Sequence, residues 1–191
     1  MNTIKLSLIC TFLALLFIGD SSVAPTAPSP ATSHWQTTFQ QRLPVYGHRN
    51  WIIVSDAAFP AYSQSGIETI VANQDLPSVL DYVAKAISSS PHVRATAFLD
   101  QELKFLEEKD YPGVTHLREE ITSAFGKTKP ISIPHSEILS KIDDAGKTFR
   151  VLFIKTNATI PYTSVYMRLD CGYMTDEVEK KIRKGVATTN D

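Results

Sequence analysis

The stretch from Gly47 to Pro60 constrains the fold most, because it places a short buried strand between two polar ends. Its centre, Trp51–Val54, combines one aromatic and three β-branched side chains, a pattern typical of a strand covered on both faces. His48 stands before this run and Asp56 follows it. Ligands of open α/β sheets bind at the carboxyl ends of the strands, so we expect Asp56 at that edge. The plainer interpretation, in which both are turn residues, stays open.

Apolar runs and helical patterns alternate along the rest of the chain. Further strands are expected over Val93–Leu99, Ile131–Pro134, Phe149–Lys155 and Ser164–Leu169. Helices are expected over His34–Arg42, Pro77–Ser88, Asp100–Glu108, Pro112–Phe125 and Thr175–Lys184, and in a segment capped by Ser136. Gln64–Gln74 is expected to be an extended or irregular crossing with Ile67, Ile70 and Val71 facing inward. The alternation predicts a single-domain α/β/α layered fold with a largely parallel sheet.

The N-terminus has the features of an export signal. In residues 1–22, Lys5 precedes an apolar run, Leu6–Ile18, that is shorter than the about 20 residues needed to span a bilayer. Residues 23–33 are rich in Pro, Ala, Ser and Thr and are expected to form a flexible tether. We therefore expect a secreted or periplasmic protein. Its folded domain would cover residues 34–174, with a C-terminal helix and tail over 175–191. Membrane attachment would follow only if the leader stayed uncleaved as a short anchor.

Composition excludes several partners and cofactors. A net charge of −1 over 191 residues gives no reason to expect a nucleic acid partner. Cys10 lies in the leader, so Cys171 has no partner for an intrachain disulfide in the mature chain. The motifs of phosphate loops, dinucleotide folds, zinc proteases and paired C-x-x-C sites do not occur. No metal or cofactor is expected. Asn157 begins a glycosylation sequon that matters only in a glycosylating cell.

Three polar points fall beyond the expected strands or in loops beside them. They are His48 with Asp56, then His135, then Tyr162-Thr163-Ser164. Two histidines, a carboxylate and a phenol can bind a polyol, and they can move protons at neutral pH without a cofactor. The residues by themselves lead no further than this.

The same points carry a resemblance to a known family. Gly47-His48 followed by Asp56-Ala57-Ala58-Phe59-Pro60 resembles the signature of the D-ribose pyranase and L-fucose mutarotase family, which pairs G-H with a later D-A-x-x-P. Val93–Leu103, Pro134–Glu137 and Pro161–Val165 resemble later segments of the family in the same order. The resemblance covers roughly Leu43 to Tyr173.

This resemblance implies a cofactor-free isomerase that interconverts the anomers or ring forms of a free monosaccharide. By position, His48 would donate a proton, Asp56 and His135 would hold sugar hydroxyls, and Tyr162 would close the site with the backbone around Thr163 and Ser164. Members of the family form ring-shaped homo-oligomers with sites between subunits.

Two departures from the family pattern keep alternatives open. Ser164 stands where the family has asparagine, and Arg49 follows the histidine in place of a small or acidic side chain. A non-catalytic sugar-binding module and a structural ring protein of the same fold are therefore the two alternatives to an isomerase.

Overall fold

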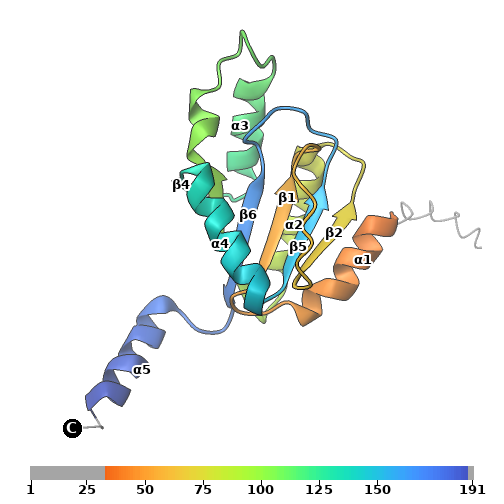
Figure 1. Cartoon of the computed structure of the whole chain (residues 1–191). Coiled ribbons are helices and arrows are strands. Elements are labelled where there is room, and N and C mark those ends of the chain that lie inside the picture. The colour runs from red at the N-terminus through yellow and green to blue at the C-terminus, as the bar shows by residue number, and fades with distance from the viewer. Residues whose placement is uncertain (1–32, 189–191) are drawn as a thin grey trace, which may run out of the picture. The chain divides into compact units, whose positions relative to one another are not determined.

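Strand β1 (Trp51–Ser55) lies inside a six-stranded sheet in the computed structural model, which describes residues 33–188 (Figure 1). The other strands are β2 (Ile67–Val71), β3 (Val93–Asp100), β4 (Ile131–Ile133), β5 (Val151–Lys155) and β6 (Val165–Cys171). Their order across the sheet is β2-β5-β1-β6-β3-β4. β1 and β2 pair with β5 in parallel and β3 pairs with β4 in parallel, whereas β6 is antiparallel to β1 and β3. The largely parallel sheet is confirmed, with β6 as an antiparallel insertion.

Helices cover both faces of this sheet. Helices α1 (His34–Arg42), α2 (Leu76–Ser88) and α3 (Val114–Ser123) pack on one face, and α4 (His135–Thr148) packs on the other (Figure 1). Two short 3-10 helices, η1 (Leu43–Val45) and η2 (Gln101–Phe105), and the terminal helix α5 (Asp176–Thr188) complete the described elements. The predicted α/β/α layers are therefore present.

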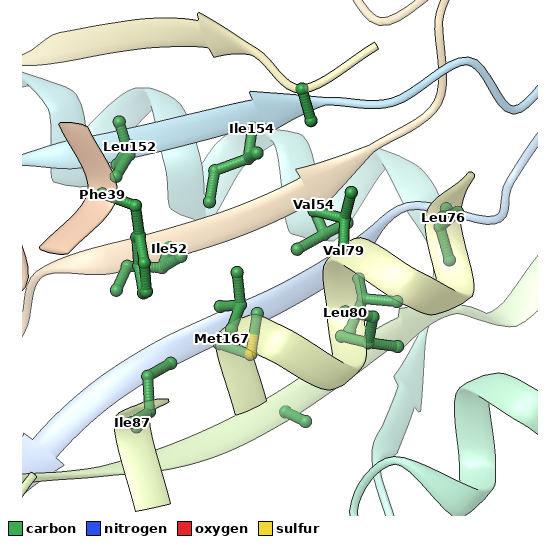
Figure 2. Close-up of a cluster of buried hydrophobic side chains, with 14 of the residues drawn as sticks. Phe39, Ile52, Val54, Leu76, Val79, Leu80, Ile87, Leu152, Ile154 and Met167 are labelled. Atoms are coloured by element: carbon green, nitrogen blue, oxygen red, sulfur yellow. The ribbon is translucent and has the colours of Figure 1, made fainter. Parts of the chain in front are cut away.

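Alternate side chains of β1 enter two separate cores. Ile52 and Val54 face α1 and α2, where they pack with the cluster drawn in Figure 2. Trp51 and Ile53 face α4 on the opposite side. All of β1 is buried, as its unbroken apolar sequence predicts.

Three local expectations are wrong. Val71, expected to face inward, is 65% exposed at the end of the edge strand β2, although the extended crossing expected over Gln64–Gln74 is confirmed by this strand. The helix expected over Asp100–Glu108 is reduced to the 3-10 turn η2, because β3 extends through Asp100. Ser136 does not cap α4, because the helix begins at His135, directly after Pro134.

Part of the domain prediction lies outside the described residues. The expected signal peptide (1–22) and all but the last residue of the expected tether (23–33) fall in that part of the chain. Residues 33–188 belong to one folded unit. None of the helices within that range is both long and apolar enough to cross a membrane.

The N-terminus of α2 offers a test of local helix stability. The Asp75 carboxylate accepts the backbone N–H of Ser78 at 2.9 Å, and this hydrogen bond lowers the pKa of Asp75. We expect Asp75→Ala to lower the free energy of unfolding by about 1 kcal/mol at pH 7, because the cap is lost. A lowered pKa means that the stabilisation exists above the unfolded-state pKa and disappears as the pH falls. The difference from wild type should therefore shrink in urea unfolding at pH 3.

A matched control is Asp81→Ala, on the exposed face of the same helix, where Asp81 pairs with Lys85. That pair is solvent-exposed and is expected to contribute less than the cap. Equal losses for the two variants at pH 7 would contradict a specific capping role for Asp75.

Candidate functional site

Polar side chains lie together at one end of four strands of the sheet. The carboxyl ends of β1, β3 and β4 meet the start of β6 there, because β6 is antiparallel to β1 and β3. Asp56 follows β1, Asp100 ends β3, His135 comes two residues after β4, and Ser164 directly precedes β6. We call this the carboxyl-edge site.

Asp56 and Ser164 form one half of the carboxyl-edge site. The Ser164 hydroxyl donates to Asp56 Oδ2 at 2.8 Å and accepts the Asp56 backbone N–H at 3.2 Å. The other carboxylate oxygen, Oδ1, accepts the backbone N–H of Ala58 at 3.0 Å. Ser164 is buried, and its hydroxyl proton is already used. The structure therefore gives Ser164 the role of orienting Asp56, whose side chain is partly exposed.

His135 and Asp100 form the other half. His135 Nδ1 lies 2.9 Å from Asp100 Oδ1, and the Asp100 side chain is 1% exposed against 31% for His135. The hydroxyl of Tyr166 donates to Asp100 Oδ2 at 3.3 Å. Glu102 accepts the backbone N–H of His135 at 3.0 Å and so caps the start of α4. Burial raises the pKa of Asp100 to about 6, although the hydrogen bond with His135 opposes this rise.

Asp100 and Tyr166 were missed in the sequence, and each had a different signal. Asp100 follows an apolar strand just as Asp56 does, and the same strand-end argument would have selected it. Tyr166 lies in a buried run and looked like a core residue. Its hydroxyl was the signal, because a buried phenol needs a hydrogen-bond partner.

Tyr162 adds an aromatic wall to the site. Its ring stands edge-on to the His135 ring, with centroids 5.3 Å apart and an angle of 84°. The Tyr162 backbone has φ +58°, in the left-handed region that non-glycine residues rarely adopt. Strain of this kind is concentrated at functional sites. Thr163 is fully buried and donates its hydroxyl to the Ile160 carbonyl at 2.7 Å, so its side chain shapes the loop.

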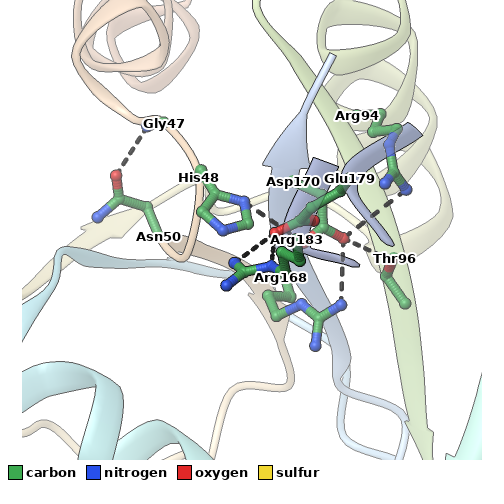
Figure 3. Close-up of polar contacts among 9 residues, drawn as sticks. All are labelled: Gly47, His48, Asn50, Arg94, Thr96, Arg168, Asp170, Glu179 and Arg183. Atoms are coloured by element: carbon green, nitrogen blue, oxygen red, sulfur yellow. Dashed lines mark hydrogen bonds and ion pairs between the residues drawn. The ribbon is translucent and has the colours of Figure 1, made fainter. Parts of the chain in front are cut away.

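His48 lies at the opposite end of the strands from the carboxyl-edge site. Its Nδ1 is 3.8 Å from Oδ1 of Asp170, near the end of β6 (Figure 3). Asp170 Oδ2 also accepts the Thr96 hydroxyl at 2.8 Å and an N–H of Arg168 at 3.2 Å, and it lies 3.9 Å from Arg94 Nη1. The His48 imidazole is therefore one of three basic groups around a single buried carboxylate.

The structure thus divides the predicted site residues into two places. Asp56, His135, Tyr162 and Ser164 come together at the carboxyl edge, and the Thr163 backbone connects two of them. Strand β1 lies between His48 and Asp56, and it spans about 13 Å from its first Cα to its last, at roughly 3.3 Å for each of the four steps. A single sugar ring is shorter than that span, so His48 and Asp56 of the same chain cannot both contact one ring.

Among residues 33–188, no group of three or more His, Cys, Asp or Glu side chains is arranged to hold a metal ion. The donors of the carboxyl-edge site are engaged with one another as hydrogen-bonded pairs.

Comparison with known proteins identifies the fold. No family model matches the chain, and no curated protein matches its sequence. Among solved structures, RbsD of Bacillus subtilis in complex with D-ribose superposes with a TM-score of 0.51 at 15% identity, covering 73% of this chain and 94% of RbsD. The fucose mutarotase of Streptococcus pneumoniae in complex with L-fucose gives a TM-score of 0.48 at 15% identity, covering 72% and 93% of the two chains. The chain has an RbsD-like α/β fold, as the sequence predicts.

Proposed function

We propose that this protein interconverts the anomers or ring forms of a free monosaccharide of the ribose or fucose type. The main support for the proposal is that Asp56, His135 and Tyr162 lie at the same carboxyl-edge site of a protein with the RbsD-like fold. A carboxylate, an imidazole and a phenol offer what a polyol needs, namely hydrogen-bond acceptors, a proton-transfer group and an aromatic surface.

The proposed chemistry is general acid–base catalysis without a cofactor. Ring opening requires a proton on the ring oxygen and removal of the proton from the anomeric hydroxyl. Asp56 would accept hydrogen bonds from sugar hydroxyls, because its oxygens are already held in place by Ser164 and Ala58. Tyr162 would cover the sugar from the β6 side of the site, and His48 would supply the proton to the ring oxygen.

His48 can fill this role only from a second copy of the chain. The length of β1 keeps it away from Asp56 of its own chain. We therefore propose a ring-shaped homo-oligomer in which His48 of one subunit reaches the carboxyl-edge site of its neighbour. Export through residues 1–22 is part of the same proposal.

The first test is saturation-transfer NMR of the anomeric protons of D-ribose and L-fucose with the purified protein. Faster exchange of either sugar than in buffer is the expected result. His48→Ala should abolish the acceleration while leaving the melting temperature nearly unchanged. His116→Ala is the control, because His116 lies exposed on α3.

Absence of acceleration for both sugars would contradict the isomerase. A melting temperature that nevertheless rises with either sugar would identify a sugar-binding module, because a ligand of the native state stabilises it. The Ser164 hydroxyl already donates its proton to Asp56, so it cannot donate to a reacting sugar. This favours the sugar-binding module as the second candidate function. No thermal shift would identify a structural ring protein.

A further inference from the structure

We infer that His135 is the base of the ring-opening step and that Asp100 is its positioning residue. This inference rests on the proposed isomerase function and extends the role of His135 from holding a hydroxyl to moving a proton. Asp100 lies within the Val93–Leu103 segment that resembles the family, but it was not among the predicted site residues.

The orientation of the His135 ring is the first argument. Its Nδ1 faces the Asp100 carboxylate at 2.9 Å. An ionised carboxylate only accepts hydrogen bonds, so the proton of the neutral imidazole must lie on Nδ1. The lone pair is then on Nε2, on the opposite side of a ring whose side chain is 31% exposed. A base at neutral pH needs this tautomer, with an unprotonated nitrogen available to the substrate.

The fixed position of Asp100 is the second argument. Its side chain is 1% exposed, and its two oxygens have separate partners, His135 on Oδ1 and the Tyr166 hydroxyl on Oδ2. Burial raises the pKa of Tyr166, which therefore remains a neutral donor. A carboxylate held from both sides cannot turn away from the imidazole. Its negative charge stabilises the imidazolium that forms when His135 takes a proton.

The connection to Asp56 is the third argument. Ser164 lies beside Tyr166 as well as holding Asp56 Oδ2 at 2.8 Å. The polar groups behind the site are thus contiguous, from the oriented Asp56 to the oriented His135. Only β6 separates β1 from β3 in the sheet, so both groups stand on the same side of the molecule, where acid–base catalysis on one ring would need them.

Ring opening by His135 needs no reactant besides the sugar and the two histidines. His135 Nε2 removes the proton of the anomeric hydroxyl, and the electron pair of that O–H bond forms the carbonyl. The bond between the anomeric carbon and the ring oxygen breaks, and the ring oxygen takes a proton from the donor proposed above, His48 of a neighbouring copy. Ring closure on either face of the carbonyl reverses both transfers and returns each histidine to its starting state.

The test compares Asp100→Asn with Glu102→Gln in the full-length protein. Glu102 also contacts His135, but only through the backbone N–H, and glutamine can still accept that bond. We expect Asp100→Asn to lower kcat for sugar exchange about 10²-fold or more with little change in KM, within the range of general acid–base catalysis. Glu102→Gln should retain kcat within about threefold, and His135→Gln should lose at least as much as Asp100→Asn.

A second readout does not depend on activity. ¹⁵N NMR of the imidazole in wild type should show His135 protonated on Nδ1 at pH 7.5, and this preference should weaken in Asp100→Asn. Wild type with the proton on Nε2 would overturn the inference, as would near-wild-type kcat in Asp100→Asn. Inactivity of wild type toward both ribose and fucose would instead refute the proposed function, and the tautomer measurement would then decide the orientation of His135 separately.

Discussion

Phe153→Ala is expected to lower the free energy of unfolding by about 3–5 kcal/mol, the usual cost of truncating a buried phenylalanine. Phe153 lies on β5 and is 1% exposed. Its ring packs against Phe59 with centroids 4.9 Å apart and against Tyr62 at 5.4 Å. Removing it leaves a cavity under the loop that follows Asp56, and the aromatic rings around it lose their shared partner. Urea or guanidinium unfolding measures the loss.

Phe105→Ala is the matched control for this truncation. Phe105 is 70% exposed at the end of η2, and its described contact is with the Lys104 ammonium, 4.8 Å from the ring centroid. An exposed cation–π pair contributes about 0.5–1 kcal/mol, so the loss should stay within that range. Similar losses for the two variants would mean that the core under the Asp56 loop is not packed as the structure shows.

The sequence predicted those features that depend on short-range pattern. Four consecutive apolar side chains required β1 to be buried on both faces, and the strand-end argument placed Asp56 at the carboxyl edge. The period of the apolar residues in α2 likewise identified its buried face. These are local consequences of side-chain spacing, which the sequence contains directly.

Features that depend on strand pairing could not be predicted in the same way. A buried run such as that of β6 looks the same whether the strand is parallel or antiparallel to its neighbours. Its direction brings Ser164 to Asp56, which is 108 positions away in sequence. The pairing of Asp100 with His135, 35 positions later, could likewise not be predicted.

The position of His48 relative to Asp56 is a different case, because the sequence contained the information. Their separation along an extended strand already implied opposite edges of the sheet. The two were treated as one polar point because they flank the same buried run of residues. The structure shows that two residues of one motif lie far apart in space when a strand runs between them.

Asp100→Asn is expected to gain stability relative to wild type as the pH rises from about pH 4 to pH 6. The pKa of Asp100 is about 6 in the folded state, against 3.8 as the ordinary value. Between these values the folded state binds a proton that the unfolded state has lost. The contribution of Asp100 to the free energy of unfolding of wild type must therefore fall as the pH rises through this window. At 1.36 kcal/mol per unit, the contribution of Asp100 falls by about 3 kcal/mol.

The groups that face Asp100 are few and come from three elements. The His135 ring on α4 and the Tyr166 hydroxyl on β6 favour the ionised form of Asp100. The Glu102 carboxylate on η2 opposes its ionisation. All three remain in Asp100→Asn, so the difference between variant and wild type reports the buried carboxylate together with its interaction with His135. Urea unfolding at pH 4, 5, 6 and 7 should show the variant gaining stability relative to wild type as the pH rises.

Asp144→Asn serves as the control for this pH series, because Asp144 is exposed on α4 and Lys147 lowers its pKa. Its sign is opposite, so Asp144→Asn should gain nothing relative to wild type as the pH rises. A difference between Asp100→Asn and wild type that stays constant from pH 4 to pH 7 would contradict a raised pKa at Asp100. The expected relative gain in stability toward neutral pH, together with the expected loss of kcat, would separate a carboxylate that orients His135 from one that only stabilises the fold. A group kept for stability should cost stability when it is replaced, whereas a group kept to orient His135 can destabilise the fold in the ionised form that the reaction requires.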